Sequence, residues 1–181
     1  MRIKEQITGH ERSELCSIVR VQTQALQASL ETVIIETSLE LSASKQLKSF
    51  MFNQLVAEGW RSHFKISKDV SEVYPLANYV LDAMQDVTSN ECNHTHRFLV
   101  EFCFDNRQAI GSNILKFEVA SRVAIQSNYQ PVPILVCAEL EVLKDYGWDG
   151  SIASSAEYEY ALRVLYRDLV QYPPIIFALC R

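Results

Sequence analysis

The stretch RFLVEFCF at residues 97–104 decides the fold, because two kinds of side chain alternate along it. One parity is aromatic or branched throughout: Phe98, Val100, Phe102 and Phe104. The other parity holds Leu99, Glu101 and Cys103. Side chains along a strand point to alternate faces. The stretch therefore predicts a strand with one buried aromatic face and with Glu101 beside Cys103 on the other face.

Downstream of this strand, helix and strand patterns alternate. The turn-type sequence DNRQAIGSN comes first, and residues 113–125 then have helical character, with Asn113 as the expected N-cap. Residues 131–140 form a continuous apolar run, which is typical of a central strand covered on both faces.

The last part of the chain repeats this alternation. Residues 155–171 predict an amphipathic helix capped by Ser154 or Ser155, and residues 174–180 predict a short apolar strand. The order strand, helix, strand, helix, strand predicts an α/β fold with a mixed sheet and flanking helices.

Upstream of residue 97 the patterns are mostly helical. Apolar spacing indicates helices over residues 10–30, 43–58 and 75–87, alternation indicates a strand over 60–67, and residues 31–41 fit either a strand or the end of the first helix. Gly59 is the expected C-terminal cap of the second helix.

Composition limits the class of protein. The chain has 181 residues, of which 48% are hydrophobic, and its net charge is −5. This length predicts a single domain over residues 1–181, and this composition excludes a disordered chain. The acidic balance argues against a protein that coats nucleic acid through an all-basic surface. The longest apolar stretches are shorter than the roughly 20 residues of a membrane-spanning helix, so we expect no membrane partner.

The cysteines and the N-terminal residues predict a cytoplasmic protein. The start MRIKEQITGHERSEL has no apolar signal-peptide core. The five cysteines include no CxxC pair, so we expect reduced thiols and no structural zinc site.

Glu101 is the strongest candidate for chemistry. A buried carboxylate is costly unless it is paired or binds a metal, and Leu99 and Cys103 on the same face argue against full exposure of Glu101. Weaker candidates are a metal pair of His94 with His96 and a nucleophilic pair of Cys92 with His94. For the two histidines, a solvated role at the turn before the strand is the favoured interpretation.

Two segments carry a resemblance to a known family. Residues 100–122, VEFCFDNRQAIGSNILKFEVASR, resemble the active-site segment of type II restriction endonucleases of the BglII/BstYI kind, within the PD-(D/E)xK nuclease superfamily. Residues 52–60, FNQLVAEGW, resemble the family's helix that ends in Gly-Trp before a strand. The resemblance implies a restriction-endonuclease-like mixed β-sheet flanked by α-helices. It also implies hydrolysis of phosphodiester bonds in double-stranded DNA with Mg²⁺ (or Mn²⁺), and a homodimer.

The resemblance assigns the acid of the family's pattern to Glu101. Two residues on, Cys103 stands where the family has Gln, Glu or Lys, and a thiol is a soft ligand that suits Mg²⁺ poorly. The family's first acid precedes this Glu closely, and Glu91 is the only acid there, so Glu91 and Glu101 are the expected metal ligands. Asp82 and Asp86 lie further back, one turn apart on the expected helix.

The helix that follows the strand supplies further candidates. Lys116 or Glu118 could replace the polar group that Cys103 does not provide, so the expected catalytic residues are Glu101, Cys103 and Lys116. Contacts with nucleic acid are expected from the residues that flank this site, namely Arg107, Asn113, Lys116 and Arg122.

Three interpretations remain open from the sequence. The first is a metal-dependent endonuclease, which requires a second carboxylate close to Glu101. The second is a catalytically inactive nuclease-fold protein that binds DNA or a protein partner. The third is an unrelated α/β interaction protein, in which Glu101 would pair with Arg97 or His96.

Overall fold

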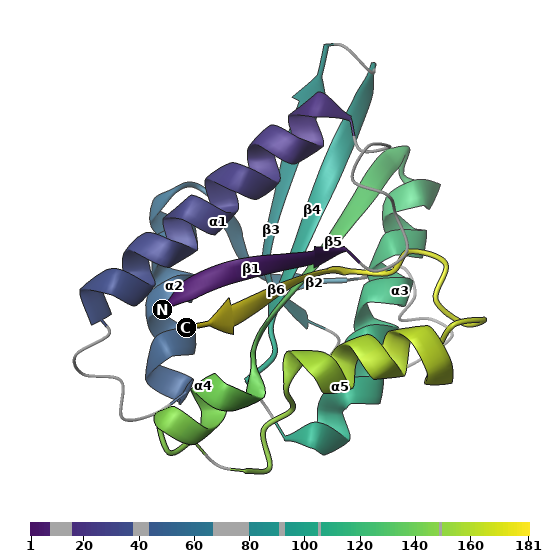
Figure 1. Cartoon of the computed structure of the whole chain (residues 1–181). Helices are drawn as coiled ribbons and strands as arrows, with labels where there is room; N and C mark the ends of the chain where they lie inside the picture. The colour runs from purple at the N-terminus through teal and green to yellow at the C-terminus, as the bar shows by residue number, and fades with distance from the viewer. Residues whose placement is uncertain (8–15, 38–43, 67–79, 91–92, 105, 149) are drawn as a thin grey trace.

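A six-stranded mixed sheet forms the centre of the protein (Figure 1). The computed structural model describes residues 1–7, 16–37, 44–66, 80–90, 93–104, 106–148 and 150–181. The strands lie in the order β1-β6-β5-β4-β3-β2. Their bounds are β1 Arg2–Ile7, β2 Arg61–Lys65, β3 Val80–Ser89, β4 His94–Phe102, β5 Tyr129–Ala138 and β6 Ile175–Cys180. The pairs β4–β5 and β5–β6 are parallel and the other pairs are antiparallel, which confirms the predicted α/β class.

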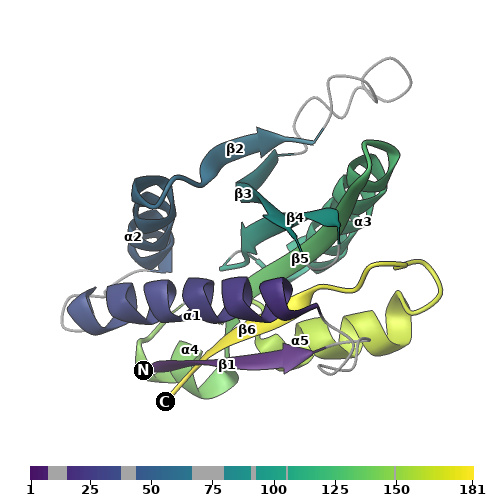
Figure 2. The same cartoon turned by 90° about the horizontal axis from the view of Figure 1, so that it is seen from above.

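Helices cover both faces of this sheet, and Figure 2 shows α1 and α3 on opposite sides of it. One core cluster joins the sheet to α1 (Ser17–Thr37), α2 (Ser44–Ala57) and α4 (Leu140–Asp145). The other cluster joins the sheet to α3 (Ile110–Gln126) and α5 (Ser155–Tyr160). A 3₁₀ turn, Arg107–Ala109, precedes α3, and a π-helical segment, Ala161–Leu165, continues α5. No helix in the part of the chain that the structure describes has the length and apolarity to cross a membrane.

Strand β4 has the two faces that its sequence predicts. Phe98, Val100 and Phe102 join the cluster of α1 and α2, whereas Leu99 and Cys103 join the cluster of α3 and α5. Glu101 lies on this second face and is only 3% exposed. The strand is therefore central, with an acidic side chain held inside the protein.

The predicted helix over residues 75–87 is wrong. Val80–Ser89 form β3, which pairs with both β2 and β4, and residues 75–79 lie outside the described residues. Leu81 and Met84 are three residues apart yet belong to the same core cluster. In a regular strand, residues three apart face opposite sides. The sequence spacing of these two apolar residues indicates a helix, although the segment pairs as a strand on both sides.

Other expectations need smaller corrections. Asn113 lies inside α3 and is buried, so it is not the helix cap, and Ala109 takes that position. The helix expected over 155–171 changes to π-helical geometry at Ala161 and ends at Leu165. Strand β1 was not expected, because the edge strand RIKEQI is mostly polar.

Several remaining expectations are confirmed. Gly59 has a φ of +86° just after α2, as a C-terminal cap requires. Residues 31–37 continue α1. Cys103, Cys137 and Cys180 are free thiols. Cys16, in contrast, is disulfide-bonded, so the expectation that all five cysteines are reduced is wrong.

Ser154 begins α5 through a capping box with Glu157. The Glu157 carboxylate accepts hydrogen bonds from the backbone N–H and the hydroxyl of Ser154, each at 2.8 Å. Because α5 is one short helix, we expect Ser154→Ala to lower the free energy of unfolding by about 1 kcal/mol. Chemical denaturation measures this value. Ser49→Ala, which removes an exposed hydroxyl within α2, serves as the control and should cost under about half as much.

Candidate active site

The candidate site lies where strands β3 and β4 separate. Their pairing ends at Ala83 and Val100, although β4 continues to pair with β5 as far as Phe102. Beyond this point, β3 pairs only with β2 among the described residues, through Leu81 and Val80. The backbone groups that face the widening gap must therefore find other partners.

Two carboxylates provide these partners. Asp82 Oδ2 accepts a hydrogen bond from the backbone N–H of Phe102 at 2.8 Å. Glu101 Oε2 accepts one from the backbone N–H of Asp82 at 3.2 Å. Each acid thus binds the backbone of the opposite strand, and the two acids meet at one point.

Two lysines from different helices complete the group. Lys48 on α2 lies 3.0 Å from Asp82 Oδ2 and donates a hydrogen bond to the carbonyl of Phe102 at 3.1 Å. Lys116 on α3 donates to Glu101 Oε1. The side chains of Lys48 and Asp82 are 29% and 15% exposed, so the site is partly open to solvent. We call these four residues the acid–lysine cluster.

Burial makes Glu101 hard to ionise. Loss of solvent, followed by the negative charge of Asp82, raises the pKa of Glu101 to about 7, against the opposing effect of Lys116 and Lys48. A carboxyl in this state gains from any further positive charge placed beside it. The site therefore favours a cation.

Cys103 is not part of this polar group. It is fully buried, and burial together with the charge of Glu101 raises its pKa well above the usual value. Asn113 Nδ2 lies 3.4 Å from Cys103 Sγ and donates to Tyr158 Oη at 3.0 Å. The thiol stays neutral in this interior network, which makes it a poor ligand for a hard cation.

One expected ligand lies outside the described residues, and another acid lies beside Glu101. Glu91 lies outside the described residues, and Asp82 lies opposite Glu101 although it is 19 positions away. The long antiparallel hairpin of β3 and β4 explains this separation. In an antiparallel hairpin, residues at equal distances from the turn lie opposite each other, and this rule places Asp82 opposite Glu101. Lys48 gives no comparable signal, because α2 approaches β4 only through tertiary packing.

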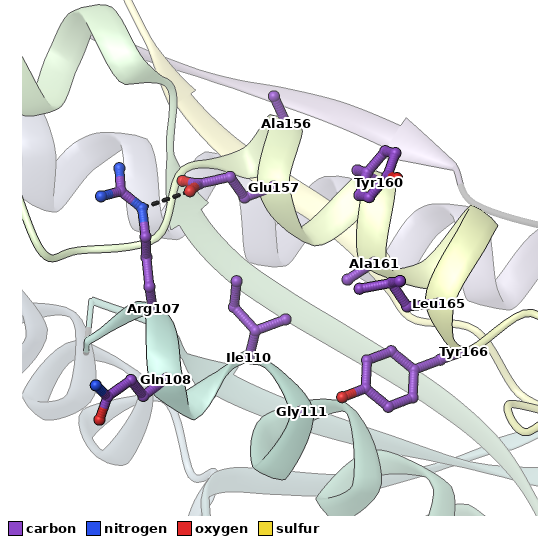
Figure 3. Close-up of a pocket in the computed structure, with 10 residues that line it drawn as sticks. All are labelled: Arg107, Gln108, Ile110, Gly111, Ala156, Glu157, Tyr160, Ala161, Leu165 and Tyr166. Atoms are coloured by element: carbon purple, nitrogen blue, oxygen red, sulfur yellow. Dashed lines mark hydrogen bonds and ion pairs between the residues drawn. The ribbon is translucent and has the colours of Figure 1, made fainter.

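The expected DNA-contacting residues are distributed around the fold. Arg107 pairs with Glu157 and donates to the carbonyl of Gly150 at 2.6 Å, at the rim of a pocket of about 530 Å³ between α3 and α5 (Figure 3). Asn113 is buried, so its amide binds interior groups. Arg122 is exposed and pairs with Glu118. Of these four expected residues, Lys116 is the one that belongs to the acid–lysine cluster, through its contact with Glu101.

Glu118 and the other candidates have structural partners. Glu118 accepts hydrogen bonds from the backbone N–H groups of Gln171 and Tyr172, which fixes the segment before β6. Arg97 pairs with Asp86, and Glu101 pairs with Lys116. The third interpretation would instead have Glu101 paired with Arg97 or His96.

The donor atoms suit a hard divalent ion. No group of three His, Cys, Asp or Glu side chains that could hold a metal occurs among the described residues. Mg²⁺, however, commonly uses one or two carboxylates and keeps several waters. Asp82, Glu101 and the Phe102 carbonyl supply oxygen donors, and the ammonium of Lys48 already contacts two of these groups. The residues present therefore fit Mg²⁺ or Mn²⁺.

Comparisons with known proteins support the fold. No family model and no curated protein matches the chain. Among solved structures, the restriction endonuclease BglII in complex with a DNA 16-mer matches with a TM-score of 0.67 and 12% sequence identity, over 100% of this chain and 77% of that one. The chain thus has a fold like that of this restriction endonuclease, a mixed sheet flanked by helices, which confirms the fold implied by the resemblance.

The raised pKa of Glu101 predicts a pH dependence of stability. Between its ordinary value of 4.5 and about 7, the folded protein holds a proton on Glu101 that the unfolded chain has lost. The free energy of unfolding therefore falls as pH rises through this window, by at most about 3 kcal/mol. Glu101→Gln should remove this component, so its stability relative to wild type should rise from pH 4.5 to pH 7.

Denaturant titrations at several pH values measure this difference. Glu58→Gln, at the exposed end of α2, serves as the matched control. Parallel pH profiles for wild type and Glu101→Gln would contradict the predicted pKa.

Proposed function

We propose that the protein is a divalent-metal-dependent DNA endonuclease of the restriction type, which hydrolyses phosphodiester bonds. The observation that carries this proposal is the meeting of Asp82 and Glu101 at the point where β3 and β4 separate. Its support from the fold is the likeness to a DNA-bound restriction endonuclease.

Asp82, Glu101 and the carbonyl of Phe102 would hold Mg²⁺ or Mn²⁺. Such an ion neutralises charge on a phosphate and on the departing oxygen. Glu101 contributes most when it is ionised, because the ion must replace the proton that burial favours. Cys103 takes no part in this proposal except as a buried support beneath Glu101.

Lys116 is the proposed polar group, in place of the Gln, Glu or Lys that the family has where this chain has Cys103. Its ammonium contacts Glu101 Oε1 from α3, so it lies beside the carboxylate that would hold the ion. From there it can donate a hydrogen bond to the attacking water or to a phosphate oxygen and hold it in place.

The proposed substrate is double-stranded DNA. The proposed location of the protein is the cytoplasm. The exposed arginines Arg107 and Arg122 are the proposed phosphate contacts, although each also has an acidic partner, Glu157 and Glu118. Such partly neutralised arginines should give modest affinity that falls as the salt concentration rises.

We further propose a homodimer. Several large apolar side chains are more than half exposed at the end of α5 and just beyond it, namely Tyr160, Val164, Leu165 and Leu169. An exposed apolar group of this kind is typical of an interface. Sedimentation equilibrium measures the mass, and Leu165→Glu should convert a dimer to a monomer.

Cleavage of supercoiled plasmid DNA tests the proposed activity. We expect nicking or cutting with Mg²⁺ or Mn²⁺ and none with EDTA. Asp82→Asn and Glu101→Gln should each reduce the rate by about 100-fold or more, since each removes a proposed metal ligand. Asp145→Asn on α4, whose carboxylate pairs with Arg181, serves as the matched control and should keep the wild-type rate.

A folded wild-type protein that neither cuts DNA nor binds Mn²⁺ would contradict this proposal. The second candidate, an inactive nuclease-fold protein that binds DNA or a protein partner, would then be favoured. Its specific support is that Lys48 and Lys116 already neutralise both carboxylates, while Cys103 replaces the family's polar residue.

Cleavage should also depend on pH. Protons compete with the ion for Glu101, whose pKa is about 7, so the rate at limiting Mg²⁺ should rise about tenfold per pH unit below 7 and level off above it. Rates at a fixed low Mg²⁺ concentration measure this effect. Saturating Mg²⁺ is the control, because it should move the midpoint to lower pH.

A further inference from the structure

Lys48 contacts the two oxygen atoms at the open end of the gap between β3 and β4. Its ammonium lies 3.0 Å from Asp82 Oδ2 and 3.1 Å from the carbonyl oxygen of Phe102. Both distances lie within the ordinary range of N–H···O hydrogen bonds. A single positive charge therefore bridges a carboxylate of β3 and a carbonyl of β4.

The same two groups are among the oxygen donors that would hold a divalent ion. A bound ion and the ammonium of Lys48 would be only a few ångströms apart. At that separation two positive charges repel each other strongly in a partly buried site. The ion and the Lys48 ammonium therefore cannot both keep their contacts with these two oxygen atoms.

We propose that Lys48 is a tethered cation that occupies part of the metal position in the metal-free protein and competes with the incoming divalent ion. This inference rests on the proposed metal-dependent function and assigns to it a residue on α2. The long side chain of Lys48 is 29% exposed, so it has a path to solvent when the ion enters.

The arrangement gives Lys48 two effects of opposite sign. Without metal, it stabilises the folded protein, because it neutralises Asp82 beside the buried Glu101. With metal, it weakens binding, because its contacts with Asp82 and Phe102 must be given up. A lysine that merely stabilised the fold would show the first effect and not the second.

Direct measurement of Mn²⁺ binding tests the competition. Calorimetry at pH 8, with no DNA present, reads the affinity independently of cleavage, and this pH limits competition by protons at Glu101. Lys48→Met should bind Mn²⁺ at least about tenfold more tightly than wild type. Lys48→Gln, which keeps a hydrogen-bond donor and loses the charge, should show the same direction and serves if Lys48→Met does not fold.

Two controls isolate the position of the charge. Lys45→Met removes one positive charge from an exposed position of the same helix and should leave Mn²⁺ affinity within about twofold of wild type. Lys48→Arg keeps the charge and should bind Mn²⁺ no more tightly than wild type. Thermal melts add a second readout: Mn²⁺ should raise the melting temperature of Lys48→Gln more than that of wild type.

The outcomes separate this inference from the function on which it rests. Tighter binding by the neutral Lys48 variants supports it, as does binding by these variants when wild type shows none. Equal or weaker binding by the folded neutral variants overturns the inference and leaves the metal-dependent function standing. Absence of Mn²⁺ binding in wild type and in all variants overturns both.

Discussion

The exchange of hydrogen bonds between β3 and β4 through carboxylates is the interaction on which the candidate site depends. Where the two strands stop pairing, Asp82 binds the backbone of Phe102 and Glu101 binds the backbone of Asp82. These bonds satisfy backbone groups that the widening gap would leave without partners. They also hold two acidic side chains close together in a largely buried place. The same contacts thus stabilise the two strands and bring the two acids of the candidate site together.

The lysines follow from this concentration of charge. Two carboxylates cannot remain ionised side by side inside a protein without compensation. Lys48 from one layer of helices and Lys116 from the other layer provide it, so the site joins both faces of the sheet. A metal ion would enter an environment that is already neutral, and its binding would rearrange existing ion pairs.

The sequence predicts the parts of this structure that depend on local patterns. The alternation in RFLVEFCF identifies β4 and its two faces, and the apolar run at 131–140 identifies the central strand β5. The position of Asp82 beside Glu101 is not predicted, because Leu81 and Met84 show helical spacing, and only pairing with β2 and β4 makes that segment a strand. Lys48 reaches a carbonyl 54 residues away, and no local pattern encodes such a contact.

The pairing of β1 with β6 has a consequence for how the chain folds. Arg2 pairs with Cys180, so the first and last strands lie side by side at one edge of the sheet (Figure 1). Contacts this distant in sequence slow folding, since nearly the whole chain must be ordered before they form. During synthesis, β1 must wait for β6 to leave the ribosome, whereas β3 and β4 can pair as a local hairpin much earlier. The gap that holds Asp82 and Glu101 would then take shape before the sheet is complete.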